Sequence, residues 1–164
     1  MRSLLAGISG VSRRLVILML VDAVLWGVWF GSMWMFRPAL ASRLGESYTE
    51  VNLMVSLPLL VAAAVQYAAG SSKRCREFIR RYRLQFMRFS SLVTRPMNLA
   101  IALVLYWELF EPRTMLYTVT AMFTLSNAVG ALGGVAWSDY AAANIPRSFR
   151  AKYAGLDAMF SNIG

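Results

Sequence analysis

The sequence contains no histidine and a single cysteine, Cys75. Without histidine the chain cannot build a Ser/His/Asp or Cys/His catalytic centre, a histidine-ligated haem or most zinc sites. One cysteine allows neither an intramolecular disulfide nor a thiolate set that holds zinc or an iron–sulfur cluster. We therefore expect no enzymatic activity, no metal and no cofactor.

Acidic residues are scarce, with 8 Asp and Glu against 17 Lys and Arg, which gives a formal net charge of +9. In a soluble protein this excess would suggest nucleic-acid binding. No segment resembles a known nucleic-acid module, so we do not expect nucleic acid as a partner. Hydrophobic residues make up 58% of the chain, against about 45–50% in ordinary soluble domains. The composition therefore favours a membrane protein.

Four long apolar runs dominate the chain. Each has about twenty residues, and a helix of that length measures about 30 Å, the thickness of the hydrocarbon core of a bilayer. We predict an all-α, polytopic transmembrane helical bundle with four spans and the start of a fifth, so that residues 1–164 form a single transmembrane domain. The predicted spans are 15–36, 51–69, 89–110 and 114–137.

The last apolar stretch, 153–164, is too short to cross a membrane. It either begins a fifth helix of an incomplete transporter half or lies on the membrane surface, and we favour the first interpretation.

Most basic residues lie in the N-terminal tail, in the 70–88 loop and after the fourth run. The two other loops are the acidic ones. The positive-inside rule therefore places the N-terminus, the 70–88 loop and the 138–152 segment in the cytoplasm. We expect the 70–88 loop to form a basic, amphipathic interfacial helix that contacts anionic lipid. The predicted location is the cell membrane, either a plasma membrane or a bacterial or archaeal inner membrane.

Polar residues inside the spans are the candidates for a substrate cavity. At 100° per residue, Asp22, Trp26 and Trp29 share one face of the first span. A carboxylate inside hydrocarbon costs about 3 kcal/mol, which favours either a proton or cationic-solute site or a structural hydrogen bond or buried pair. The two indoles could hold an aromatic or cationic ligand. Gln66 and Asn127 lie in polar stripes of the second and fourth spans, where hydrogen bonding to a neighbouring helix is the alternative.

Two pairs of glycines have the GxxxG spacing that lets helices approach closely. They are Gly27 with Gly31 and Gly130 with Gly134, and we predict that they serve helix packing.

The chain resembles the first four to five helices of major facilitator superfamily transporters. The layout of basic and acidic loops is similar, and so is the start of the second span, Val51-Asn-Leu-Met-Val-Ser-Leu-Pro58. After the fourth span, Trp137-Ser-Asp139, Asn144-Ile-Pro146 and Arg150-Ala-Lys-Tyr-Ala-Gly155 are similar to the family's tryptophan–aspartate, proline and Arg-x-Lys/Arg-aromatic-x-Gly pattern. The loop after the second span departs from the family's Gly-x-x-x-Asp-Arg/Lys-x-Gly-Arg, because its aspartate and second glycine are missing. The residues matched to these cytoplasmic motifs are Gly70, Lys73, Arg74, Arg76, Asp139, Pro146, Arg150 and Gly155.

The resemblance implies transport of a small solute by alternating access, with the first and fourth spans lining a cavity and the third outside it. The partners would be the lipid bilayer, a small-molecule solute and a second transporter half or other membrane subunits. The alternative is a small integral-membrane accessory subunit without transport activity, which the short length, the altered loop motif and the GxxxG faces favour.

Overall fold

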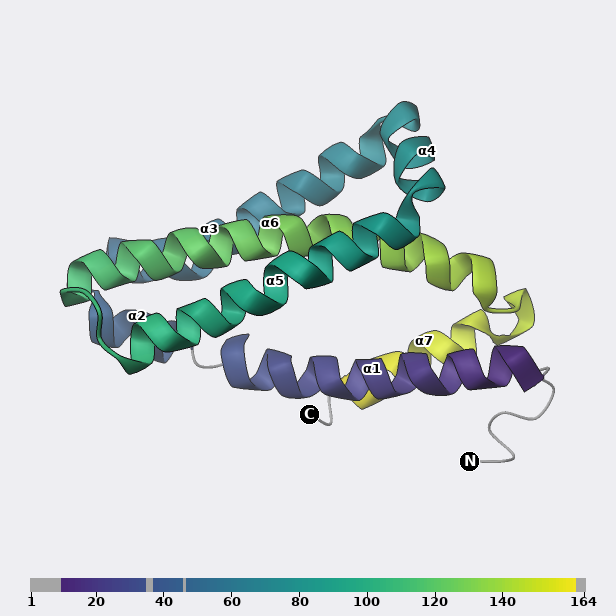
Figure 1. Cartoon of the computed structure of the whole chain (residues 1–164), viewed down its shortest axis with the longest axis horizontal. Coiled ribbons are helices and arrows are strands. Elements are labelled where there is room, and N and C mark those ends of the chain that lie inside the picture. Colours follow the sequence, from purple (N-terminus) through teal and green to yellow (C-terminus); the bar gives the residue numbers. More distant parts are fainter. Residues whose placement is uncertain (1–9, 35–36, 46, 162–164) are drawn as a thin grey trace. The chain divides into compact units, whose positions relative to one another are not determined.

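The computed structural model describes residues 10–34, 37–45 and 47–161, and these are almost entirely helical (Figure 1). No strand occurs within these ranges. The helices are α1 (Gly10–Trp34), α2 (Arg37–Leu44), α3 (Tyr48–Ser71), α4 (Lys73–Arg81), α5 (Arg83–Tyr106), α6 (Pro112–Asn144), the three-residue 3₁₀ helix η1 (Arg147–Phe149) and α7 (Arg150–Ser161).

Three of these helices, α3, α5 and α6, are long and apolar enough to cross a membrane. This confirms the prediction of an all-helical chain with helices that could cross a membrane. The count of four spans and the cytoplasmic N-terminus stay predictions. In the most apolar stretch of each helix, 39% of the residues of α6 are fully buried, against 17% in α3 and 6% in α5. Thus α6 is the central helix of the three, and most of α5 is left to face its surroundings.

Several predicted boundaries were wrong because hydropathy does not detect polar helical turns. The fourth run was expected to end at residue 137, whereas α6 continues to Asn144. The third run was expected to begin at residue 89, whereas α5 begins at Arg83 and ends at Tyr106. Its first turns are built from Arg, Leu, Gln and Met, which are good helix formers whatever their polarity. The segment 37–50, expected to be a loop, contains the eight-residue helix α2.

The end of α5 is set by backbone geometry. Glu108 has a φ of 47°, in the left-handed region, and the Leu109 N–H donates to the Val104 carbonyl at 3.4 Å. This is the Schellman arrangement that closes many helices. It explains why α5 stops at Tyr106 although the apolar sequence continues to Phe110.

The chain divides into two compact units, and the first contains residues 1–36 and 141–164. Within it α1 and α7 lie side by side and run in the same direction (Figure 1). Val16 and Met19 on α1 and Tyr153 on α7 are buried. Arg150 donates from Nε to the Ile145 carbonyl at 3.2 Å and from Nη2 to the Ala142 carbonyl. Its guanidinium therefore caps the last turn of α6, where a positive charge also favours the helix dipole.

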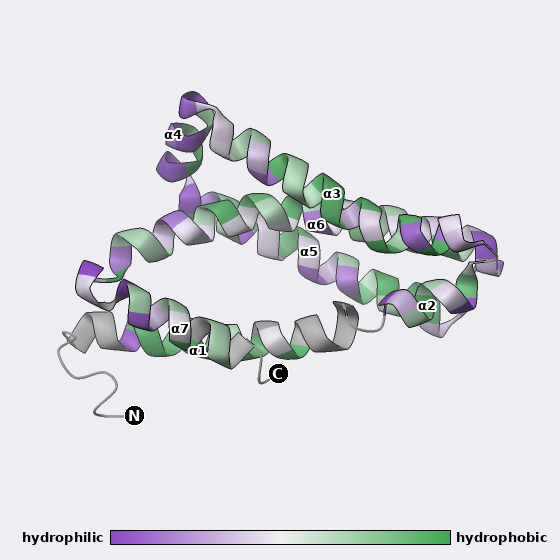
Figure 2. Ribbon diagram, turned by 180° about the vertical axis from the view of Figure 1, so that it is seen from behind, coloured by the Kyte–Doolittle hydropathy of each residue, from purple (hydrophilic) through white to green (hydrophobic). Residues whose placement is uncertain are grey.

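The second unit, residues 37–140, contains α2 to α5 and most of α6. Here α3 and α5 are linked by α4, which is markedly hydrophilic (Figure 2). Two apolar clusters form its core, and α6 contributes to both. The larger consists of Ala41, Met54, Ile101, Met115, Leu116, Val119 and Phe123, and the smaller of Ala69, Ile79 and Ala136.

The contact between α5 and α6 is closest at Gly133. A methyl group there would lie 2.6 Å from the Ser90 Cβ, well inside van der Waals contact. Farther along the same interface, the Ser126 hydroxyl donates to Asn98 Oδ1 at 3.3 Å. Small and hydrogen-bonding residues at such an interface are typical of packed membrane helices.

Replacing Gly133 by alanine should destabilise the protein, because the added methyl must push the two helices apart. We expect a loss of about 1–3 kcal/mol in the free energy of unfolding, the usual cost of overpacking. Thermal unfolding of the purified protein in detergent measures this loss. The neighbouring substitution Gly134→Ala is the matched control and should be neutral or stabilise by up to about 1 kcal/mol, since its methyl meets no described atom within 4 Å and alanine favours a helix interior. Equal effects of the two substitutions would contradict this account of the interface.

Candidate functional site

The predicted cavity residues of the first span lie in α1, within the first unit. Asp22 is exposed on this helix. Trp26 follows it by four residues and Trp29 by seven, so the helical register keeps the three on one side. The side chains of Trp26 and Trp29 lie outside the described part of the structure.

The other two cavity candidates belong to the second unit. Gln66 is exposed near the end of α3, whereas Asn127 is half-buried in the middle of α6. The Asn127 Nδ2 donates to the Phe123 carbonyl of its own helix at 2.7 Å. This bond uses one amide hydrogen and leaves the amide oxygen and the other hydrogen for a further partner.

A line of polar side chains follows α6, and each returns to the carbonyl four residues before it. Thr120 donates to Leu116 at 2.7 Å, Thr124 to Thr120 at 2.7 Å, and Ser138 to Gly134 at 2.9 Å. A hydroxyl that donates within its own helix keeps its acceptor lone pairs. The line is therefore satisfied locally, and it still offers oxygen atoms along an otherwise apolar helix.

The glycines predicted to pack helices have different surroundings. Gly27 is buried in α1, and the surroundings of Gly31 lie outside the described residues. A Cβ on Gly130 would lie 3.8 Å from Thr94 Cγ2, an ordinary contact, and one on Gly134 would meet no described atom within 4 Å. The close approach in α6 thus occurs at Gly133, one residue before the predicted position.

The residues matched to cytoplasmic motifs are spread over both units. Gly70, Lys73, Arg74 and Arg76 are exposed on α3 and α4, and Asp139 is half-buried on α6. Among the described residues, no ion pair joins Asp139 to that basic loop.

In the first unit the motif residues surround the start of α7. Pro146 is the N-cap residue of η1, and Gly155 is exposed on α7. Arg150 is the motif residue with a defined structural role, as the cap of α6 described above.

A polar cluster that the sequence motifs did not predict is formed by Ser47, Glu50, Arg113 and Tyr117, here called the Glu50 cluster. Glu50 is only 8% exposed. Its Oε1 accepts from Arg113 Nε at 3.1 Å and from the Tyr117 hydroxyl at 2.9 Å. Its Oε2 accepts from the Ser47 N–H at 3.2 Å, while the Ser47 hydroxyl accepts from the Glu50 N–H. One carboxylate therefore caps α3 and ties that helix to the first turns of α6.

The sequence did carry a signal for part of this cluster. Ser47 and Glu50 have the Ser-x-x-Glu spacing of a capping box, and both of its hydrogen bonds are present. The partners on α6 lie more than 60 residues away, and no local pattern indicates them.

Arg37 is a second charged residue in an unexpected place, since it is 1% exposed at the start of α2. Its guanidinium carbon lies 3.8 Å from the centre of the Phe123 ring. Burial lowers the pKa of Arg37 to about 10, which leaves the group charged at neutral pH. The ring face of Phe123 supplies a favourable electrostatic contact for that charge.

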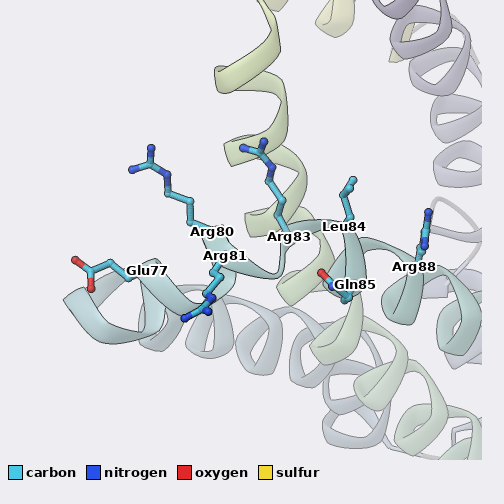
Figure 3. A pocket seen from close by; sticks show the side chains of 7 residues that line it. All are labelled: Glu77, Arg80, Arg81, Arg83, Leu84, Gln85 and Arg88. Atoms are coloured by element: carbon cyan, nitrogen blue, oxygen red, sulfur yellow. The ribbon is translucent and has the colours of Figure 1, made fainter.

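At the opposite end of the second unit, α4 and the start of α5 form a concave, arginine-rich surface, here called the arginine pocket (Figure 3). Figure 3 shows Arg80, Arg83 and Arg88 projecting to the same side as Leu84. The lining residues are Glu77, Arg80, Arg81, Arg83, Leu84, Gln85 and Arg88. Within the described part of the chain, no group of three or more potential metal ligands is present.

No family model, curated protein or solved structure matches this chain. The resemblance to major facilitator transporters therefore stays a prediction from the sequence motifs.

The Glu50 cluster should stabilise the junction between α3 and α6. Replacing Glu50 by alanine removes a helix cap and leaves Tyr117 and Arg113 without their carboxylate. We expect a loss of about 1–3 kcal/mol in the free energy of unfolding, measured by thermal unfolding in detergent. Glu50→Gln keeps one acceptor oxygen, which can serve the Ser47 N–H, and its amide N–H can donate to the Tyr117 hydroxyl. Only the bond from Arg113, which is 65% exposed, is then lost, so this variant should lose less than Glu50→Ala, about 1 kcal/mol. The control is Glu111→Ala in the exposed loop before α6, and an equal loss in this control would rule out a specific role for the cluster.

Proposed function

We propose that this chain is an integral membrane bundle that takes part in moving a small solute across the membrane, as the N-terminal part of a major facilitator-like transporter. The observation that carries the proposal is the polar line of α6. A helix that is apolar enough to span a membrane holds the half-buried Thr124 and Asn127 at successive turns, and each has hydrogen-bonding capacity left. Thr120, one turn before them, is buried inside the second unit. Exposing such groups to hydrocarbon costs free energy, whereas beside a water-filled path they can hydrogen-bond water or a solute.

In this proposal α1, the predicted first span, also crosses the membrane, in addition to α3, α5 and α6. It has 25 residues, enough to cross a bilayer, and it carries Asp22 on the face that also holds Trp26 and Trp29. The proposed topology has a cytoplasmic N-terminus, α4 on the cytoplasmic side and the Glu50 cluster on the opposite side. The distribution of arginine supports this orientation, because α4 and the start of α5 are the most basic part of the chain.

The proposed chemistry divides between the two helices. Asn127 and Thr124 offer neutral donors and acceptors, which suit hydroxyl, carbonyl or amide groups of a solute. Asp22 offers one titratable charge, which suits a proton or a cationic group. Alternating access requires a second bundle that faces this one, so transport is assayed on the longest natural chain that contains these residues.

Asn127 should be reachable from water, whereas a neighbouring residue on the outer surface of α6 should not. In a Cys75→Ser background, we expect Asn127→Cys to react with a charged, membrane-impermeant maleimide in membranes opened to both sides. The matched control is Leu125→Cys, two residues away and 52% exposed, which should react only with a lipid-soluble maleimide. Mass spectrometry of the purified protein quantifies both labels. Failure of the charged reagent to label Asn127→Cys would remove the water path and leave the accessory-subunit alternative.

Asp22 should couple transport to protons if it is the titratable site. Uptake of a panel of radiolabelled sugars, amino acids and organic cations is compared in cells expressing the natural chain and its Asp22→Asn variant. We expect the variant to lose the pH dependence of uptake, or to lose uptake of cationic solutes, with normal amounts of protein in the membrane. Unchanged pH dependence together with unchanged cation uptake would exclude Asp22 from coupling.

A further inference from the structure

The arginine pocket lies where a membrane-spanning helix begins. The span α5 starts at Arg83, and the preceding span α3 ends at Ser71, so α4 links two spans directly. Residues at the first turns of a spanning helix lie at the level of the lipid headgroups, because the next twenty residues fill the hydrocarbon core. Arg83 and Arg88 are therefore placed at the bilayer surface by the chain itself.

The charge of the pocket is unbalanced. Its lining holds four arginines against the single carboxylate of Glu77, and Gln85 adds a neutral amide. Within the described residues, none of these arginines forms an ion pair. Two are oriented by aromatic rings, with Arg81 at 5.6 Å from Tyr82 and Arg83 at 5.6 Å from Tyr140. A concave group of guanidinium forks matches the tetrahedral oxygens of a phosphate.

Apolar side chains beside the arginines indicate what carries the phosphate. Leu84 belongs to the lining and is 48% exposed, and it projects to the same side as Arg83 and Arg88 (Figure 3). Phe78, Tyr82 and Phe89 are also exposed on α4, its C-cap and the first turns of α5. A site for a soluble phosphate has no need of exposed apolar neighbours, whereas a lipid supplies both a charged headgroup and acyl carbon.

We infer that the arginine pocket is a binding site for an anionic phospholipid. The phosphate lies among Arg80, Arg83 and Arg88, Gln85 contacts the polar part of the headgroup, and Leu84 contacts the first carbons of the acyl chains. Glu77, at the rim, opposes the negative headgroup and weakens binding. A bound lipid would hold the end of α4 against the start of α5.

The test uses the purified full chain in zwitterionic phosphatidylcholine nanodiscs, titrated with phosphatidylglycerol carrying brominated acyl chains that quench tryptophan fluorescence. We expect the triple variant Arg80→Gln, Arg83→Gln, Arg88→Gln to weaken phosphatidylglycerol binding by at least about tenfold, because it removes the guanidinium groups that hydrogen-bond the phosphate directly. The matched control, Lys73→Gln, Arg74→Gln, Arg76→Gln, removes the same number of charges from α4 but outside the pocket lining. It should weaken binding by less than about threefold, because these side chains contribute only an attraction to the headgroup that salt screens.

Two further measurements keep the test decisive if the triple variant folds poorly. Glu77→Gln, which removes only the opposing charge, should strengthen phosphatidylglycerol binding by a few fold. Soluble glycerol 3-phosphate should not displace the lipid at micromolar concentration. An equal loss of phosphatidylglycerol affinity in the two triple variants would contradict a specific site and indicate a general attraction between the basic surface and anionic lipid. Displacement by micromolar glycerol 3-phosphate would instead assign the pocket to a soluble phosphorylated ligand.

Discussion

A bilayer offers no water to polar groups in its interior, so each such group must find its partner within the protein. In α6 most of these partners are in the same helix. Thr120, Thr124 and Asn127 all donate to carbonyls four residues earlier. Because each of these side chains makes one hydrogen bond within α6 itself, α6 can hold a central place without fixed polar contacts on every side. Its packing against α5 is then decided by shape, with Gly133 against Ser90 at the closest point.

The ends of the second unit follow a different rule, because there charges can reach the headgroup region. The Glu50 cluster joins the start of α3 to the start of α6 through a single buried carboxylate. At the other end, α4 carries arginines that face outward and an isoleucine, Ile79, that is buried with Ala69 and Ala136. At the Glu50 end, charged groups therefore bond to one another within the protein. At the α4 end, the arginines are exposed to the surroundings.

The apolar runs alone predicted the three helices that can cross a membrane, since length and hydropathy are properties of the sequence. Boundaries failed where polar residues continue a helix, as at Arg83–Arg88 and in α2. The tight contact with α5 lies at Gly133, which is not a member of the predicted Gly130–Gly134 pair, because the face that touches α5 depends on how the two helices cross. The capping half of the Glu50 cluster was readable as a Ser-x-x-Glu pattern. Its long-range half, like the stacking of Arg37 on Phe123, depends on the tertiary fold and has no local signature.

The burial of Arg37 has a consequence for how the chain is made. Its guanidinium rests on the ring of Phe123, and the ribosome synthesises that phenylalanine long after the arginine. During synthesis α2 therefore has no surface to receive its charge until α6 has been made. The docking of α2 is then a late step of biogenesis, and an arrest of translation before α6 would leave this segment open to proteases.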